Sequence, residues 1–114
     1  MNTPISTSLS AVCTIDQVLP GTGVCAWVNG HHIAIFRVTS EQWFAIDNVD
    51  PRTGRSVLAR GLVGNLGEQI VVASPLYKNH IDLRTGQGVE DPSEQVAVYP
   101  VHTKDGQVWV AVPS

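Results

Sequence analysis

Short apolar runs separated by turn residues constrain the fold of this chain most strongly. Two of these runs, residues 24–28 and 33–38, are separated by Asn29-Gly30. Both residues tolerate positive φ, which makes Asn-Gly the strongest short-range signal for a tight β-hairpin. No segment shows a sustained helical period, and ten glycines and seven prolines punctuate the 114 residues. The pattern predicts an all-β fold of short strands joined by turns.

Further runs on both sides of this hairpin predict more strands. Residues 11–15 and 43–46 would join the hairpin in a four-stranded antiparallel meander. Near the end of the chain, residues 96–102 and 107–112 are joined through Asp105-Gly106, which is again a hairpin signal. We therefore expect an antiparallel β-sandwich or small barrel with two sub-sheets.

The middle of the chain, residues 48–67, interrupts this regular pattern. Residues 56–60 fit either a strand or a single helical turn. Glycines at positions 61, 64 and 67 do not match the spacing of a phosphate-binding loop, so we interpret them as turn residues. This irregular segment is expected to separate the two sub-sheets.

A polar loop follows the irregular segment and is the first candidate for a functional site. Residues 70–73 predict a buried strand, the loop begins at Ser74-Pro75, and a short strand over residues 81–84 ends at Thr85-Gly86. A polar loop held between two strands is a favourable position for function, because the strands fix the loop without burying it.

Composition and charge exclude several classes of function. The formal net charge is −3, and the seven Lys and Arg residues form no basic cluster, which argues against nucleic acid or an anionic membrane as partner. No apolar run is long enough to span a membrane. Residues 1–8 lack the features of a signal peptide, so we expect a flexible N-terminus, a single domain over residues 9–114 and a cytoplasmic location.

The cysteines and histidines are not spaced as metal ligands. Cys13 and Cys25 lie in apolar runs without CxxC spacing, and we interpret them as buried free thiols. His31 and His32 are adjacent in a strand, so their side chains point to opposite faces. His80 is the only histidine in the candidate loop. The carboxylates at positions 47, 50, 90 and 91 lie on turns, where we expect them to be solvated.

The order of two loops resembles the Rieske iron–sulfur family. Its first loop reads Cys-x-His, and its second reads Cys-Pro-x-His-Gly before a Phe-Asp-x-x-Thr-Gly-like strand and turn. Here Asn48-Val49-Asp50 matches the first loop, and Ser74-Pro75-Leu76-Tyr77-Lys78 matches the second. Residues 81–86 match the segment that follows. The resemblance implies a Rieske-like fold with a smaller, loop-bearing sub-sheet.

The ligand positions depart from the family pattern. Asn48 and Ser74 stand at the two cysteine positions, and Asp50 and Tyr77 stand at the two histidine positions. A Rieske cluster requires two thiolates on one iron and two imidazoles on the other. The chain is therefore expected to hold neither a cluster nor another metal, and to have no catalytic site of its own.

Within that family the chain is most similar to the small subunits of assimilatory NAD(P)H-dependent nitrite reductase. Residues 20–24, Pro-Gly-Thr-Gly-Val, and residues 33–36, Ile-Ala-Ile-Phe, resemble motifs of those subunits. The resemblance implies a cytoplasmic accessory subunit in nitrate and nitrite assimilation. Its large-subunit partner would carry FAD, an iron–sulfur cluster and sirohaem, and would reduce nitrite to ammonium.

The two former ligand loops would then form a rigid tip that contacts the large subunit. Tyr77 is of a residue type enriched at interface hot spots, and four polar residues would surround it. These residues are Arg52, Lys78, Asn79 and His80. Alternatively, Tyr77 fills the space of the missing cluster and hydrogen-bonds within the domain.

Two other functions stay open at this point. One is a Rieske-type electron-transfer ferredoxin that binds metal through unconventional ligands such as Asp50, Tyr77 and His80. The other is a free-standing binding domain unconnected with nitrogen metabolism.

Overall fold

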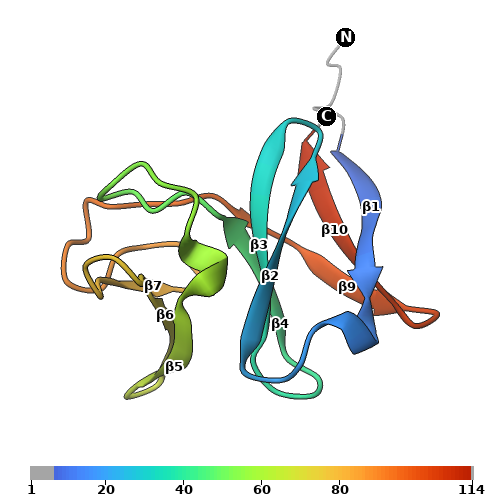
Figure 1. Cartoon of the computed structure of the whole chain (residues 1–114), viewed down its shortest axis with the longest axis horizontal. Helices are drawn as coiled ribbons and strands as arrows, with labels where there is room; N and C mark the ends of the chain where they lie inside the picture. The colour runs from blue at the N-terminus through green and yellow to red at the C-terminus, as the bar shows by residue number, and fades with distance from the viewer. Residues whose placement is uncertain (1–6, 114) are drawn as a thin grey trace, which may run out of the picture.

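Antiparallel strands account for about half of residues 7–113, the part of the chain that this computed structural model describes (Figure 1). The all-β prediction is confirmed. The elements are β1 (Thr7–Thr14), η1 (Ile15–Gln17), β2 (Thr22–Val28), β3 (His31–Arg37), β4 (Trp43–Asp47), η2 (Leu58–Arg60), β5 (Leu62–Leu66), β6 (Gln69–Ala73), β7 (His80–Asp82), β8 (Val98–Tyr99), β9 (Val101–Lys104) and β10 (Gln107–Pro113), where η marks a single 3₁₀ turn.

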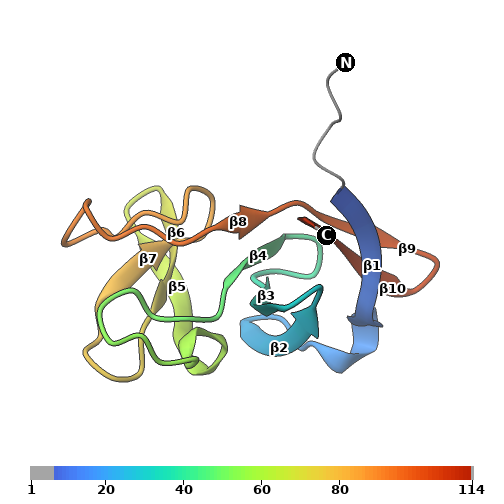
Figure 2. The same cartoon turned by 90° about the horizontal axis from the view of Figure 1, so that it is seen from above.

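The strands form three antiparallel sheets. Their orders are β1-β10-β9, β2-β3-β4-β8 and β5-β6-β7. The β5–β7 sheet stands to one side of the other two in both views and carries the long loops at its outer end (Figures 1 and 2). This is the smaller, loop-bearing sub-sheet that the family resemblance implies, although the described residues form three sheets and not the two that the pattern of strands predicts.

Both predicted hairpin turns are confirmed. Asn29 and Gly30 have φ of 51° and 81°, and Asp105 and Gly106 have φ of 55° and 74°. Positive φ at both central residues matches the right-handed twist of the flanking strands, so each two-residue turn sets the register of its hairpin. Val28 accordingly pairs with His31.

The predicted four-stranded meander is wrong in its first strand. β1 pairs with β10 along its whole length, from Thr7 opposite Pro113 to Thr14 opposite Gln107. The fourth strand of the β2-β3-β4 sheet is β8. The turn-rich connection after β1 carries the chain to the other sheet, where Arg37 Nη1 donates a hydrogen bond to the Val18 carbonyl at 3.0 Å.

The irregular middle contains a strand that the sequence did not predict. β5 runs through Gly64, which is therefore a strand residue and not a turn residue. All five residues of β5 are exposed or half-buried, so the strand lacks the alternation that reveals a buried face. Residues 56–60 contribute η2, which is the helical alternative, and Ser56 makes an isolated bridge with Val49.

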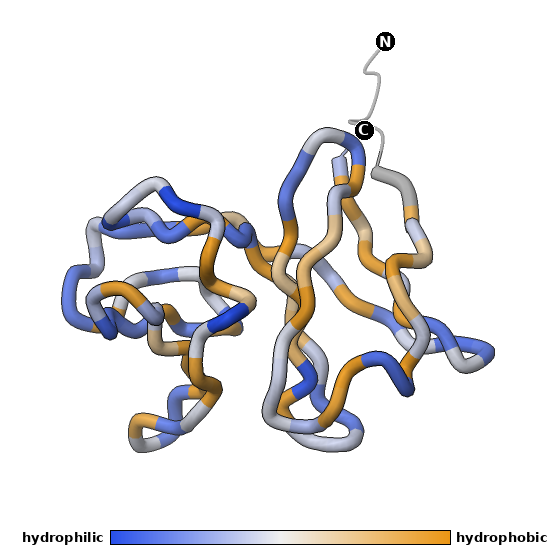
Figure 3. Tube along the Cα trace, viewed as in Figure 1, coloured by the Kyte–Doolittle hydropathy of each residue, from blue (hydrophilic) through white to orange (hydrophobic). Residues whose placement is uncertain are grey.

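Two hydrophobic clusters share β3 as their common wall. Ala34 and Phe36 face the β5–β7 sheet and pack with Leu58 and Ile81. Ile33 and Ile35 face the opposite way, toward the β10 side of the molecule. A strand covered on both faces is apolar throughout, which explains the unbroken run at residues 33–36. Figure 3 shows apolar residues along the strands and hydrophilic residues on the loops at either end.

The predicted flexible N-terminus falls largely on residues 1–6, which lie outside the described part of the chain. Cys13 and Cys25 are both free thiols, but the prediction that both are buried is wrong. Cys25 is exposed on β2, and Cys13 is half-buried, where burial raises the pKa of its thiol.

Candidate functional site

Three loops meet at the outer end of the β5–β7 sheet (Figure 2). The first loop comprises residues 48–55, and the second comprises residues 74–79. We call these two the loop tip, because they are the loops that resemble the ligand loops of the Rieske family. The third loop comprises residues 88–95 and is connected to the first loop through Arg52 and to the start of β7 through His80.

A buried hydrogen-bond network joins the first loop to the second. Asp50 is fully buried, and its Oδ2 accepts a hydrogen bond from Ser74 Oγ at 2.6 Å. Its Oδ1 accepts from the Arg52 backbone N–H at 2.9 Å and from Asn79 Nδ2 at 3.3 Å. A buried carboxylate is tolerated only with such partners, so the network explains why Asp50 can be buried. The expectation that Asp50 is solvated is therefore wrong.

Asn48 has an equally internal role. Its side chain is 2 % exposed, and its Oδ1 accepts a hydrogen bond from the Ala59 N–H at 2.7 Å. Its backbone carbonyl accepts from the Leu58 N–H at 3.0 Å. Asn48 thus fixes η2 against the first loop. Its Nδ2 lies 3.4 Å from Nδ1 of His32.

The second loop is closed by its own backbone. The Ser74 N–H donates to the Asn79 carbonyl at 2.8 Å, and the Lys78 N–H donates to the Ser74 carbonyl at 2.9 Å. Lys78 has φ of 58°, a conformation that reverses the chain within a few residues. This closed turn projects Leu76 and Tyr77 outward, with 43 % and 66 % of their surfaces exposed.

The third loop is attached by one ion pair and by hydrogen bonds between His80 and Glu90. Arg52 meets Glu94 in a two-pronged contact of 3.1 and 3.3 Å, and this hydrogen bonding raises the pKa of the guanidinium. His80 Nδ1 lies 2.6 Å from Glu90, whose carboxylate also accepts from the His80 N–H at 2.7 Å. Burial acts to raise the pKa of Glu90, but the hydrogen bonds from His80 outweigh it and lower the pKa.

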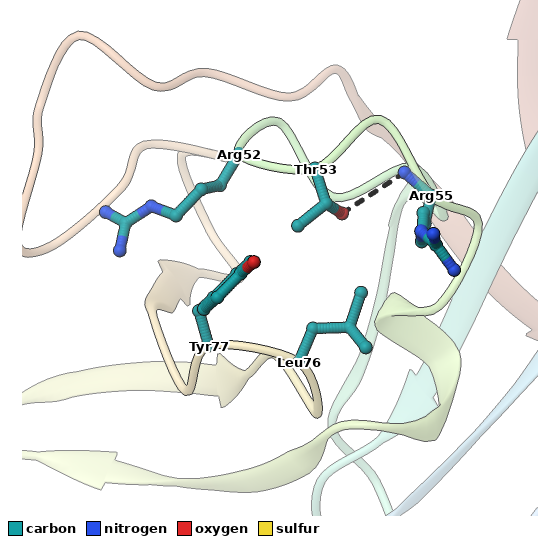
Figure 4. Close-up of a pocket in the computed structure, with 5 residues that line it drawn as sticks. All are labelled: Arg52, Thr53, Arg55, Leu76 and Tyr77. Atoms are coloured by element: carbon teal, nitrogen blue, oxygen red, sulfur yellow. Dashed lines mark hydrogen bonds between the residues drawn. The ribbon is translucent and has the colours of Figure 1, made fainter.

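An open hollow of about 550 Å³ separates the first loop from the second (Figure 4). Leu76 and Tyr77 form one wall, and Arg52, Thr53 and Arg55 form the other. Figure 4 shows Leu76 and Tyr77 projecting from the second loop toward the first.

The residues proposed for partner contact differ in how far the structure exposes them. Tyr77 and Lys78 are exposed, Arg52 is exposed but paired with Glu94, and His80 is half-buried. Asn79 is the exception, because only 2 % of it is exposed, so it is not available as a contact residue. The alternative that Tyr77 fills the interior is also wrong, since its side chain points outward and its hydroxyl bonds to no described residue.

Sequence reasoning missed Glu94 as the partner of Arg52 in the loop tip, and Glu90 as the partner of His80 at the start of β7. Glu90 pairs with a residue ten positions away, and Glu94 with one 42 positions away. No local sequence pattern indicates which residues pair across such separations in the chain. Both glutamates lie in a polar segment that reads only as a loop.

Comparisons with known proteins identify the family of this chain. The model of the Rieske-like [2Fe-2S] domain family matches residues 8–111. The nitrite reductase (NADH) small subunit of Salmonella typhimurium is 47 % identical over 98 residues, covering 85 % of this chain and 91 % of that protein. This chain belongs to the nitrite reductase small-subunit family of Rieske-like domains.

Two further relatives extend the comparison of this small subunit. A crystal structure from Mycobacterium tuberculosis, described as an NADH-dependent nitrite reductase small subunit, has a TM-score of 0.90 at 34 % identity, covering 96 % of this chain and 98 % of that one. The nitrite reductase [NAD(P)H] large subunit of Klebsiella oxytoca is 38 % identical over 100 residues, covering 88 % of this chain but 10 % of that protein.

The residues of this small subunit do not fit the [2Fe-2S] cluster that its fold family implies. The four ligand positions supply no thiolate and no imidazole. Asn48, Asp50 and Ser74 are buried and bonded to protein groups, whereas Tyr77 points outward. Residues 7–113 contain no group of three or more His, Cys, Asp or Glu side chains placed to hold a metal ion. The same residues form no helix with the length and hydrophobicity of a membrane span.

Proposed function

We propose that this chain is the non-catalytic accessory subunit of a cytoplasmic NAD(P)H-dependent nitrite reductase, and that its loop tip binds the large subunit. The observation that carries the proposal is the state of the ligand positions. This chain is 47 % identical to a nitrite reductase small subunit. At three of its four cluster-ligand positions, the side chain forms hydrogen bonds inside the domain.

The partner assigned here is the large subunit. In the Klebsiella oxytoca protein, a segment similar to this chain is part of the large-subunit polypeptide itself. A domain that is covalently joined to the large subunit in one organism is a natural non-covalent partner in another. The large subunit would carry FAD, an iron–sulfur cluster and sirohaem, and nitrite reduction to ammonium in nitrate assimilation would occur there.

The ferredoxin alternative would use Asp50, Tyr77 and His80 as ligands. Asp50 is enclosed by Ser74 and Asn79, and His80 is paired with Glu90. A metal would have to displace both sets of partners and draw in an exposed tyrosine. These contacts favour the accessory role over electron transfer.

Iron and sulfide analysis of the purified chain, with its visible spectrum, tests the non-catalytic role. We expect no visible absorption band, no stoichiometric iron, and no nitrite-dependent oxidation of NADH or NADPH by the chain alone. A stoichiometric cluster would overturn the accessory role and favour the ferredoxin.

The Tyr77→Ala variant tests the docking part of the proposal. We expect its affinity for the large subunit to fall at least about tenfold, as for an interface aromatic. Leu19→Ala is the matched control, because Leu19 is 68 % exposed and lies outside the loop tip, before β2. Both variants should keep the wild-type melting temperature. Unchanged affinity of a folded Tyr77→Ala variant removes this residue from the interface.

A further inference from the structure

Exposed apolar side chains gather around the second loop. Leu62 is 79 % exposed, Tyr77 is 66 % exposed and Leu76 is 43 % exposed. Leu62 begins β5, which lies beside the strand that enters the second loop. Large apolar groups concentrated on one surface mark an interaction site more often than scattered ones do.

Unpaired cations lie on the same surface. Arg55, Arg60 and Lys78 are exposed, and none has a carboxylate partner among the described residues. Arg52 differs, because Glu94 neutralises it. Three unpaired cations on one surface contrast with the net charge of −3 of the whole chain.

These cations line two hollows beside the second loop, where the side chains of Leu76 and Tyr77 form a ridge. The first hollow is the one between Arg52, Arg55 and Tyr77. The second, of about 380 Å³, has Arg60 and Lys78 in its walls together with Leu62 and Pro75. Among the described residues, no acidic side chain lines either hollow. Each hollow therefore combines cations with apolar surface, with the ridge of Leu76 and Tyr77 beside them.

We propose that the large subunit covers both hollows with an acidic surface, whose carboxylates pair with Arg55, Arg60 and Lys78 and whose apolar side chains cover the ridge. This inference rests on the proposed accessory role and adds the chemistry of the partner. Charge complementarity of this kind speeds association and selects the partner more than it adds affinity.

A protein surface fits these hollows better than a small anion does. A specific small-anion site brings several buried donors to one point. Here the cations are exposed and divided between two hollows, and they share the walls with apolar side chains, Leu76 in the first hollow and Leu62 and Pro75 in the second. One acidic surface reaches both hollows at once and also buries the ridge.

Neutralising single cations tests the inference against a matched control. Arg60→Gln and Lys78→Gln each remove one positive charge from the second hollow, and Arg55→Gln does so from the first. Lys104→Gln removes the same charge from the end of β9, outside both hollows. For each of these three variants in the hollows, we expect the association rate with the large subunit to fall about three- to tenfold at low salt. Lys104→Gln should leave it unchanged.

Salt dependence and phosphate binding complete the test. Wild-type affinity should fall as salt rises, and the fall should be shallower for an Arg60→Gln/Lys78→Gln double variant. If the wild type binds but the Arg55, Arg60 and Lys78 variants behave like Lys104→Gln, the acidic-partner inference fails while the accessory role stands. If the wild type does not bind, both fail. Saturable binding of inorganic phosphate to the free chain, lost when these cations are neutralised, would make this a small-anion site and overturn the inference.

Discussion

Removing the Asp50 carboxylate should destabilise the whole domain, because this group joins the two loops of the tip. In Asp50→Ala, the Ser74 hydroxyl and the Asn79 amide lose their acceptor while both residues stay almost fully buried, with exposures of 1 % and 2 %. The Arg52 N–H also loses its partner, but its exposed position lets water replace the carboxylate.

The expected loss follows from the two buried donors. Leaving a buried donor unsatisfied costs about 1–3 kcal/mol, with the 2.6 Å bond from Ser74 in the upper half of that range and the 3.3 Å bond from Asn79 in the lower half. Asp50→Ala should therefore lower the free energy of unfolding by about 3–5 kcal/mol, and the melting temperature by roughly 10–20 °C. Asp50→Asn keeps the shape and one acceptor oxygen, so it should lose about half as much.

Urea denaturation followed by tryptophan fluorescence measures this loss. The slope of the free energy against urea concentration should be unchanged, so that the midpoint reports stability alone. Asp16→Ala is the control, because Asp16 is exposed in η1 and bonds to no described side chain, and its effect should stay within about 0.5 kcal/mol. A loss below about 1 kcal/mol for Asp50→Ala would refute the conclusion that this network holds the tip together.

Two further predictions concern the connections behind the tip. Gly86→Ala should lower the free energy of unfolding, measured by thermal denaturation, by about 3 kcal/mol or more, because the φ of Gly86 is 78° and a Cβ would collide with the Val96 carbonyl. Gly54 has a φ of 72° but open space around it, so Gly54→Ala should cost only about 1 kcal/mol. Equal losses in the two variants would contradict this. Hydrogen bonds from His80 lower the folded pKa of Glu90, so the stabilisation is complete above its ordinary pKa of 4.5 and is lost as pH falls through the folded value. Glu90→Gln should accordingly be less stable than wild type by under about 1 kcal/mol at neutral pH, a difference that disappears in acid; a difference that grows in acid would contradict this.

The strands and hairpins could be predicted because their signals are local. Asn29-Gly30 and Asp105-Gly106 fix their turns through positive φ, which depends on the two residues alone. The unbroken apolar run of β3 reports a strand buried on both faces. β5 escaped prediction for the opposite reason, because none of its residues is fully buried.

The absence of cluster ligands could also be predicted, since a change of residue type is visible wherever the chain folds. Asn48, Asp50, Ser74 and Tyr77 cannot supply two thiolates and two imidazoles in any arrangement. The sequence did not show which of these side chains would point into the domain. Asn79 and Lys78 are neighbours in one turn, yet the first is buried and the second exposed.

By itself, the sequence determined that this protein is built of antiparallel strands, and that two of its loops match the ligand loops of the Rieske family without any of the four ligands. Only the tertiary structure decided that β1 pairs with β10, that Asp50 joins Ser74 and Asn79 in place of metal bonds, and that unpaired cations gather around an apolar ridge. The physical reason is range. Turn and strand signals act over a few residues. These contacts join groups that are far apart in the chain, and no local sequence pattern indicates that they will meet.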